Sequence, residues 1–280
     1  MKWGAWGAKF NTSQYLAMIE ACMENGITTF DHADIYGHYT VEEEFGKALS
    51  EYSSIRNKIQ LISKCGINMP SPNREEYTIK HYDTSPAHIR KSVEQSLKNL
   101  RTDYLDVLLL HRPDPLMDPD EVCNTFALLQ KEGKVLHFGV SNFSPSQTAL
   151  IHSFFPLVTN QVEISIIHLA PFTDGLLDYC QSQKIVPMGW SPLGGGNIFN
   201  STLERDKRIV AVSQFLSIKY MVSASQILLA WLLQHPSGII PVLGTANALR
   251  VKEAMGAISI KITREEWFML WRASTGEEVA

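Results

Sequence analysis

The chain has 280 residues, of which 45% are hydrophobic and 19% are charged, which is ordinary for a soluble globular protein and sufficient for a sizeable core. The formal net charge of −4 and the absence of a basic cluster argue against nucleic acid as the main partner. The N-terminal stretch MKWGAWGAKFNTSQ has no apolar signal-peptide core, and no uninterrupted apolar run reaches membrane-spanning length, so we expect a cytoplasmic protein without a membrane partner.

Seven short β-rich runs are predicted as strands, the third of them by a continuous apolar run. In chain order they are the run ending in TTFDH (28–32), IQLISK (59–64), YLDVLLLH (104–111), VLHFGVS (135–141), TNQVEIS (159–165), IVPMGW (185–190) and GIIPVLG (238–244).

Helical patterns with start signals lie between these strands. Thr40 and Glu43 are spaced as a capping box for VEEEFGKAL, and a proline at the first helical position follows Ser85, Asp118 and Ser144. Asp174-Gly175 leads another helix. A helical pair at 203–219 and 223–235 precedes the last strand, and TREEWFMLWRA (263–273) predicts an extra amphipathic helix at the C-terminus.

Strands that alternate with helices of 10–15 residues indicate right-handed βαβ units and a parallel sheet. Seven or eight such units predict an α/β fold, a (β/α)8 TIM barrel in a single domain (1–280), with its first strand largely truncated and supplied by the first few residues. A doubly wound sheet is the structural alternative, but no G-x-G-x-x-G follows a strand. Cys22, Cys65, Cys123 and Cys180 form no Cys-x-x-Cys, so we expect reduced, mostly buried thiols.

Polar residues fall at the predicted strand ends, where barrel active sites are built. Asp31, Lys64 and His111 end three consecutive strands, and Tyr36 follows Asp31 by five residues. Taken singly, each has a structural interpretation: a helix cap for Asp31, a solvated strand end for Lys64, a satisfied core histidine for His111. Together they suit proton transfer to a carbonyl, because an ammonium favours the phenolate of a nearby tyrosine and lowers its pKa, and a neutral histidine can orient a carbonyl oxygen.

Over nearly its whole length the chain resembles the aldo-keto reductase family. The stretches that match in order and spacing are FDHADIYG, LISKCG, LLLHRPDP, FGVSNFS, TNQVEIS, WSPLGGG and PVLGTANALRVKEA. The SPLGGG loop and the VLGT segment resemble the bacterial oxidoreductases and potassium-channel β subunits more than aldose reductase.

The resemblance implies an NADP(H)-dependent reductase of a small-molecule aldehyde or ketone. It implies that Tyr36 is the general acid/base, that Lys64 and Asp31 activate it, and that His111 orients the carbonyl. The implied cofactor residues are, for the nicotinamide, Ser141, Asn142, Gln161 and Trp190; for the pyrophosphate, Ser191, Leu193 and Gly194; and for the adenosine with its 2′-phosphate, Gly244, Thr245, Asn247, Arg250 and Glu253.

The stretch FDHADIYG also permits a metal site, since His32, Asp34 and His38 have ligand side chains. Mononuclear barrel hydrolases use His-x-His at an early strand end, and this sequence has none, so we expect loop and packing roles for these three residues and no metal. No G-x-S-x-G motif indicates a serine nucleophile.

The chain departs from the family pattern in two places. Most of the first barrel strand is missing before the segment MKWGAWG, and Ala254 replaces an asparagine of the adenosine segment. Within residues 241–250, Arg250 is the only cationic residue, so the binding of a 2′-phosphate would depend on it.

A low-turnover NADP(H)-binding regulatory or redox-sensing protein is the alternative to an enzyme, and the intact set Asp31, Tyr36, Lys64 and His111 favours the enzyme. The sequence does not define the substrate or the choice between a monomer and a weak oligomer. The loop 66–83, with Trp3, Trp6, Tyr39 and Met69, is the candidate substrate pocket.

Overall fold

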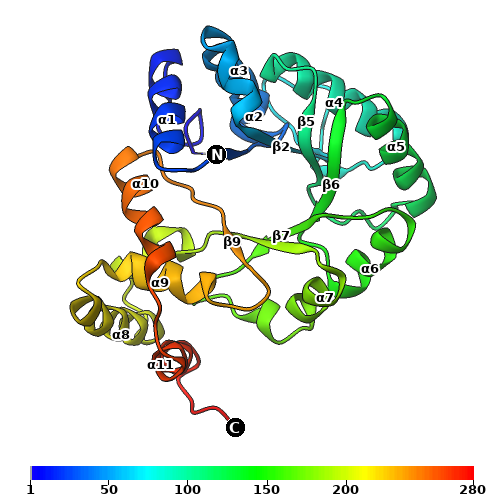
Figure 1. Ribbon diagram of the computed structural model, residues 1–280. Helices are drawn as coiled ribbons and strands as arrows, with labels where there is room; N and C mark the ends of the chain where they lie inside the picture. The colour runs from blue at the N-terminus through cyan, green and yellow to red at the C-terminus, as the bar shows by residue number, and fades with distance from the viewer. Residues whose placement is uncertain (1) are drawn as a thin grey trace. The chain divides into compact units, whose positions relative to one another are not determined.

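The computed structural model describes residues 2–280, and they group into two compact units, one that extends to Asn160 and one from Gln161 to Ala280. Each unit is described by itself below. Parallel strands alternate with helices in both (Figure 1), which confirms the α/β class predicted from the sequence. The single domain over residues 1–280 stays a prediction.

The first unit is built on four parallel strands in the order β1-β2-β5-β6. Their bounds are Thr29–Asp31 (β1), Gln60–Cys65 (β2), Leu105–Leu110 (β5) and Val135–Ser141 (β6). The register places Asp31 opposite Ile62 and Lys64 opposite Leu109, so the polar ends of the strands lie at one edge. Residues 2–11 contain no strand, so the expectation that the N-terminal residues form one is wrong.

Helices surround these strands, and α3, α4 and α5 lie on the outside of β2, β5 and β6 in Figure 1. The bounds are Thr12–Glu24 (α1), Tyr36–Tyr39 (α2), Val41–Glu51 (α3), Ser53–Lys58 (η1), Pro86–Leu100 (α4), Pro119–Lys131 (α5) and Pro145–Phe154 (α6). The side chains of Ser85, Asp118 and Ser144 accept backbone N–H groups of the first turns of α4, α5 and α6, and a proline follows each cap, as predicted.

Two local predictions need correction. Thr40 precedes α3 without capping it; its hydroxyl donates to the Gly37 carbonyl (2.8 Å), because its backbone is already helical and turns the side chain away from the helix start. Helix α1 was not predicted, although Asn11 and Gln14 form a capping box at its start.

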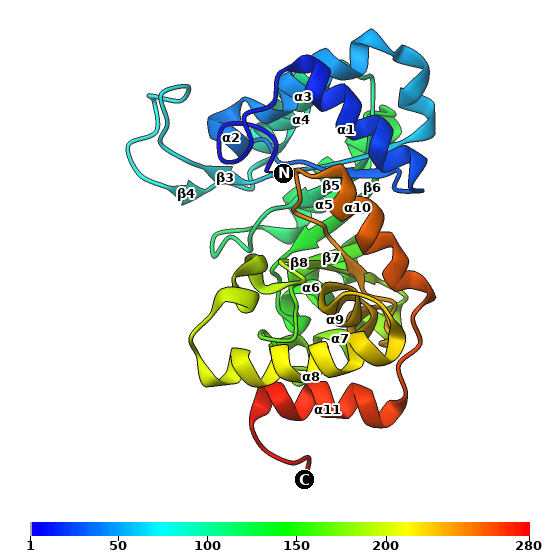
Figure 2. The same ribbon diagram turned by 90° about the vertical axis from the view of Figure 1, so that its left-hand side faces the viewer.

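A short antiparallel hairpin of β3 (Ile67–Asn68) and β4 (His81–Tyr82) was also not predicted. In Figure 2 its connecting loop extends away from the helices of its unit. This hairpin places the loop 66–83, the candidate substrate segment, beyond the end of β2.

The second unit contains β7 (Thr159–Glu163, which starts at the boundary), β8 (Val186–Trp190) and β9 (Ile240–Pro241), in that order. Strand β9 is much shorter than the predicted 238–244, because Pro241 has no N–H for a ladder. The chain nevertheless continues beside β8, since the Val242 N–H donates to the Gly189 carbonyl (2.8 Å).

The other elements of this unit are Ala170–Phe172 (η2), Leu176–Gln183 (α7), Gly194–Asn200 (η3), Glu204–Tyr220 (α8), Ala224–Leu233 (α9), Ala248–Met255 (α10), Gly256–Ser259 (η4) and Arg264–Thr275 (α11). The predicted C-terminal helix is confirmed as α11, with its Thr263–Glu266 capping box, and it lies beside α8 (Figure 2). The rings of Trp231 and Trp267 stack 4.7 Å apart, and each indole N–H donates to the other residue's carbonyl (3.1 and 3.0 Å).

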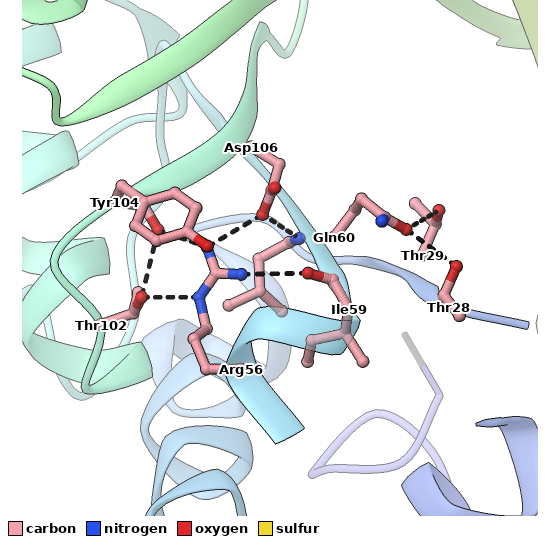
Figure 3. A network of polar contacts seen from close by, with 9 residues as sticks. Thr28, Thr29, Arg56, Ile59, Gln60, Thr102, Tyr104 and Asp106 are labelled. Carbon is pink, nitrogen blue, oxygen red and sulfur yellow. Dashed lines mark hydrogen bonds and ion pairs between the residues drawn. The ribbon is translucent and has the colours of Figure 1, made fainter. Parts of the chain in front are cut away.

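A network of polar contacts closes the N-terminal ends of β2 and β5 (Figure 3). The Arg56 guanidinium donates to the Thr102 hydroxyl (2.7 Å), to the carbonyls of Ile59 (3.0 Å) and Tyr104 (2.8 Å), and to the Asp106 carboxylate (2.9 Å). Asp106 also accepts the backbone N–H of Leu61 on β2 (2.8 Å). The network therefore joins η1 to both strands.

The four cysteines are free and buried, as predicted. Among residues 2–280 no single helix is long and apolar enough to cross a membrane, and only α8 and α9 together, bent by 94°, meet the criteria of length and composition.

Candidate active site

Lys64 is the centre of a polar cluster at the C-terminal ends of β1 and β2. Its ammonium donates to both carboxylate oxygens of Asp31 (2.7 Å each), to the His32 carbonyl (2.8 Å) and to the Tyr36 hydroxyl (3.2 Å). The side chain of Lys64 is only 1% exposed, so these contacts replace nearly all of its hydration. The structure thus brings together three of the four residues that the sequence placed at the catalytic centre.

Tyr36 is aimed at Lys64 by a tight turn. Gly37 and His38 both have left-handed backbone conformations (φ 60° and 59°), so the chain reverses directly after Tyr36 and then enters α3. A Cβ atom on Gly37 would lie 2.6 Å from the Val41 side chain, so glycine is required by both the conformation and the space.

His111 follows the last residue of β5, and its backbone N–H donates to the Cys65 carbonyl (2.8 Å), which fixes its height beside β2. Its ring lies edge-on to that of Tyr36, with centroids 5.9 Å apart. It is 9% exposed, and its Nδ1 has no hydrogen-bond partner among the described residues.

Burial keeps His111 neutral. The pKa of its imidazole is well below the usual value, because desolvation disfavours the charged ring and the cations of Lys64 and Arg112 oppose it further, while Asp31 acts in the other direction. A neutral imidazole can donate one N–H to a carbonyl oxygen.

The pKa of Tyr36 differs from the sequence-based expectation. Lys64 does lower it, as expected, but burial of the phenol is the larger cause, and the pKa of Tyr36 lies above 10.0. For Lys64, burial alone would lower the pKa, yet the charges of Asp31 and Tyr36 and their hydrogen bonds raise it above 10.5. At neutral pH the cluster therefore contains a protonated phenol beside a permanent ammonium.

Behind the cluster, a buried carboxyl fastens β2 to the helices. Ser63 precedes Lys64 on β2, so its side chain lies on the opposite face, where its hydroxyl donates to Glu42 of α3 (2.6 Å). Asn99 of α4 donates to the other oxygen of Glu42 (3.4 Å). Burial raises the pKa of Glu42, and these hydrogen bonds partly oppose the rise.

His32 and Asp34 of FDHADIYG, and His38 directly after it, lie in different surroundings. His32 is fully buried against the Phe45 ring (centroids 4.4 Å apart), and burial lowers its pKa to about 3. The Asp34 carboxylate accepts the Ile35 N–H (2.7 Å), whereas His38 is exposed. In the described part of the chain, no group of three or more His, Cys, Asp and Glu side chains is arranged to hold a metal ion.

The predicted cofactor residues of the first unit are at the end of β6. Ser141 is buried, and the Asn142 amide donates to its hydroxyl (2.8 Å). Asn142 has a left-handed backbone (φ 60°), which asparagine tolerates better than most residues. Such strained positions are frequent at ligand sites.

In the second unit, Gln161 is buried on β7 and Trp190 ends β8, with its carbonyl accepting the Ile164 N–H (3.4 Å). Ser191 has a left-handed backbone (φ 52°), and its carbonyl accepts the N–H of Gly194 (2.8 Å). Gly194 and the two glycines that follow all have positive φ, and Leu193 is half-buried. The predicted pyrophosphate segment is thus a glycine-rich turn.

The predicted adenosine segment starts α10. Asn247 caps this helix by accepting the N–H groups of Leu249 (2.9 Å) and Arg250 (3.4 Å). Arg250 is exposed, and its guanidinium has no ion pair or hydrogen bond with the residues that the structure describes.

At the other residues of this segment, a side chain on Gly244 would meet open space. Thr245 is half-buried and accepts the Asn247 N–H (3.1 Å), and the Glu253 carbonyl accepts from Gln226 (2.8 Å). The exposed start of α10, together with an Arg250 side chain that has no partner among the described residues, fits the binding of an adenosine that carries a phosphate.

The four candidate pocket residues lie in different surroundings. Trp3 is buried among Phe10, Tyr15, Phe30 and Phe45 and belongs to the core, so its assignment to the pocket is wrong.

The other three candidates lie near Tyr36. Trp6 is 44% exposed, and its ring lies 6.2 Å from that of Tyr36. Tyr39 is tied to Met69 by two hydrogen bonds (2.8 and 3.2 Å).

Two charged residues near this site were missed. Arg112 directly follows His111, and the guanidinium of Arg74 lies 4.6 Å above the Tyr39 ring. Arg112 stands in the stretch LLLHRPDP, where a cation directly after His111, the residue predicted to orient the carbonyl, was the available signal.

A model of the Aldo/keto reductase family matches residues 1–273. The oxidoreductase YdhF of Escherichia coli is 45% identical over 281 residues, which cover 99% of this chain and 93% of that protein. A 6-dehydroglucose reductase of Agrobacterium fabrum is 44% identical over 266 residues, 94% of this chain and 89% of that protein.

Two solved structures are also similar. A thermostable aldo-keto reductase in complex with the inhibitor epalrestat has a TM-score of 0.78 at 27% identity and covers 97% of this chain and 93% of that one. An aldo/keto reductase of Klebsiella pneumoniae in complex with NADP and acetate has a TM-score of 0.76 at 26% identity, covering 93% and 85%. The predicted (β/α)8 barrel class is confirmed by these similarities.

Proposed function

Because the chain belongs to the aldo/keto reductase family, we propose that it is an NADP(H)-dependent enzyme that reduces an aldehyde or ketone to an alcohol, with Tyr36 as the general acid. The observation that carries this proposal is the position of the Lys64 ammonium, which joins the Asp31 carboxylate to the Tyr36 hydroxyl within 3.2 Å in a buried setting. A buried lysine held between a carboxylate and a phenol is an arrangement for controlling a proton on the phenol.

Tyr36, His111 and Lys64 have different roles around the carbonyl oxygen of the substrate. The Tyr36 hydroxyl and a neutral His111 both donate toward it, which polarises the carbonyl and fixes its orientation. As negative charge develops on this oxygen, Tyr36 transfers its proton. The phenolate that remains is stabilised by the Lys64 ammonium, which Asp31 holds in place.

The raised pKa of Tyr36 agrees with this direction of proton transfer. Burial keeps the phenol protonated at neutral pH, so it is ready to act as an acid, and the nearby ammonium limits the cost of its ionisation. For alcohol oxidation the same phenol would first have to lose its proton, which favours that direction at higher pH.

The reduced nicotinamide of NADPH supplies the hydride when it is bound. The residues that would hold this cofactor are those at the ends of the strands and at the start of α10: Ser141, Asn142, Gln161, Trp190, Ser191, Leu193, Gly194, Gly244, Thr245, Asn247, Arg250 and Glu253. The glycine-rich turn after β8 and the exposed Arg250 at the start of α10 fit its two phosphate regions.

The similarity to a 6-dehydroglucose reductase makes an aldehyde on a small polar molecule the first substrate class to test. NADPH oxidation should be followed at 340 nm with 6-dehydroglucose, simple aliphatic and aromatic aldehydes, and ketones. Turnover of at least one aldehyde, with formation of one alcohol per NADPH consumed, is the expected result. Tight NADPH binding without turnover of any carbonyl would instead support the low-turnover regulatory protein.

A further inference from the structure

Arg112 is a cation without a partner next to the proposed carbonyl site. It directly follows His111, it is half-buried, and its guanidinium makes no hydrogen bond or ion pair with any of residues 2–280. A guanidinium has five N–H donors, and removing part of its hydration without a compensating acceptor is unfavourable. The N–H donors of the Arg112 guanidinium are therefore available to bind an anion.

The carboxylates of Asp114 and Asp31 are hydrogen-bonded to other residues. Asp114, two residues further on, accepts the Leu116 N–H with one oxygen (2.9 Å) and the Thr84 hydroxyl with the other (3.0 Å). Asp31 places both of its oxygens on Lys64. No ion pair with a described residue thus neutralises Arg112.

The charge of Arg112 also reaches the two groups that would hold the carbonyl oxygen. Beside the larger effect of burial, the Arg112 cation lowers the pKa of Tyr36 and the pKa of His111. Lys80, in the loop of the β3–β4 hairpin, acts on His111 in the same way. Arg112 is therefore one of the charges that act on both groups of the proposed carbonyl site.

We propose that Arg112 binds an anionic group of the substrate, so that the enzyme prefers carbonyl compounds that carry a carboxylate or phosphate. The planar guanidinium suits this role because it can meet a carboxylate or a phosphate with two parallel N–H donors. The residue that orients the carbonyl and the residue that binds the anion are then neighbours in the chain, at the end of β5. This inference rests on the proposed reductase activity and adds a substrate class to it.

The test compares two aldehydes of nearly the same shape, 4-carboxybenzaldehyde and its neutral methyl ester, with NADPH as the reductant. In the wild type we expect kcat/KM for the carboxylate to exceed that for the ester by about tenfold or more, the effect of one charge-assisted hydrogen bond. Arg112→Gln should remove this advantage, so that the ratio of the two kcat/KM values falls toward one, mainly through a higher KM of the carboxylate. Arg112→Lys keeps the charge and should retain part of the preference.

Arg90→Gln is the matched control, because it makes the same change in net charge at a half-buried arginine of α4 that is paired with Glu132 (2.8 Å). It should leave the ratio of the two substrates unchanged. The NADPH dissociation constant of Arg112→Gln should also stay within about twofold, since the proposal assigns Arg112 to the substrate.

Three results would overturn the inference. A wild-type ratio near one would do so without any variant, and so would an unchanged ratio in a folded Arg112→Gln protein. A parallel loss of NADPH affinity in that variant would assign the arginine to the cofactor instead. If the wild type reduces neither aldehyde nor any other carbonyl compound, the reductase proposal itself fails, which is a different outcome from reduction without a preference for the anion.

Discussion

Two ion pairs with mostly buried side chains lie near opposite ends of strand β2, and they are built differently. At the N-terminal end, Arg56 and Asp106 are joined at 2.9 Å, and three further N–H donors of Arg56 go to one hydroxyl and two carbonyls (Figure 3). At the C-terminal end, Lys64 and Asp31 are joined at 2.7 Å, but the ammonium also donates to the hydroxyl of Tyr36.

The difference is between a closed network and one that leaves reactive groups available. Every partner of Arg56 is a fixed part of a loop or a strand, so the network can only hold these segments together. Around Lys64, by contrast, neither Nδ1 of the neutral His111 nor the guanidinium of Arg112 has a hydrogen-bond partner among residues 2–280. Buried charge alone therefore does not mark a catalytic site; the marker is buried charge that adjoins groups with unused hydrogen-bonding capacity.

Among the variants that test this comparison, Tyr36→Phe should cause the largest loss of activity. Removal of the hydroxyl deletes the proposed proton donor while the ring still fills its place, so kcat should fall by about 10²- to 10⁴-fold and NADPH affinity should stay within a few-fold. Stopped-flow or steady-state NADPH oxidation measures it. Tyr52→Phe, at a half-exposed tyrosine of the same unit, is the control. Retention of more than a tenth of the wild-type turnover would remove Tyr36 from the role of acid.

Lys64→Met should reduce turnover strongly and shift the pH dependence. Lys64 lowers the pKa of Tyr36 against the larger effect of burial, so without the ammonium the pKa of the phenol rises further. For reduction, the fall in rate at alkaline pH should then occur at higher pH than in the wild type. The pH profile of kcat/KM, measured with one aldehyde from pH 6 to 11, distinguishes this from a loss of folding. An unchanged profile together with unchanged turnover would exclude Lys64 from the mechanism.

Arg56→Gln should give the opposite pattern. The closed network loses its charge and leaves Asp106 uncompensated, and breaking one partner of a buried pair typically costs about 3 kcal/mol of folding stability. The kcat of the protein that remains folded should stay within about twofold. Urea unfolding and activity below the transition measure the two effects. If Arg56→Gln lowered kcat as much as Tyr36→Phe does and left the stability unchanged, the two ends of β2 would not differ in function.

Arg250→Ala tests an open arginine in the second unit. Arg250 is exposed at the start of α10 and has no partner among the described residues, so its loss should cost little stability. NADPH affinity should fall by about ten- to a hundredfold, the effect of charge-assisted bonds to a 2′-phosphate, and NADH affinity should change little. Titrations of Trp fluorescence with both cofactors decide the matter. Equal losses for NADPH and NADH would show a structural role for the arginine.

Much of the fold was predictable from the sequence because its signals are local. The apolar run of β5, the proline-led helices and the C-terminal helix α11 all depend on neighbouring residues, and the structure has them where they were predicted. The hairpin of β3 and β4 was not predictable, because two-residue strands show no alternation.

The candidate site shows the same division. Asp31, Lys64 and His111 could be brought together from the sequence because parallel strands end at one edge. The Arg56–Asp106 network joins residues 50 positions apart with no motif, so only the structure reveals it. The net direction of the Tyr36 pKa depends on how deeply the phenol is buried, which the sequence does not contain.

The Trp231–Trp267 pair of the second unit has a practical consequence for spectroscopy. Two indole rings held nearly parallel (15°) at 4.7 Å, with both N–H groups fixed by hydrogen bonds, couple their electronic transitions in a chiral setting. Near-UV circular dichroism should therefore contain a strong tryptophan signal that originates in the core of this unit. Loss of that signal during denaturation would report on packing around α9 and α11, and not on the chemistry at Tyr36.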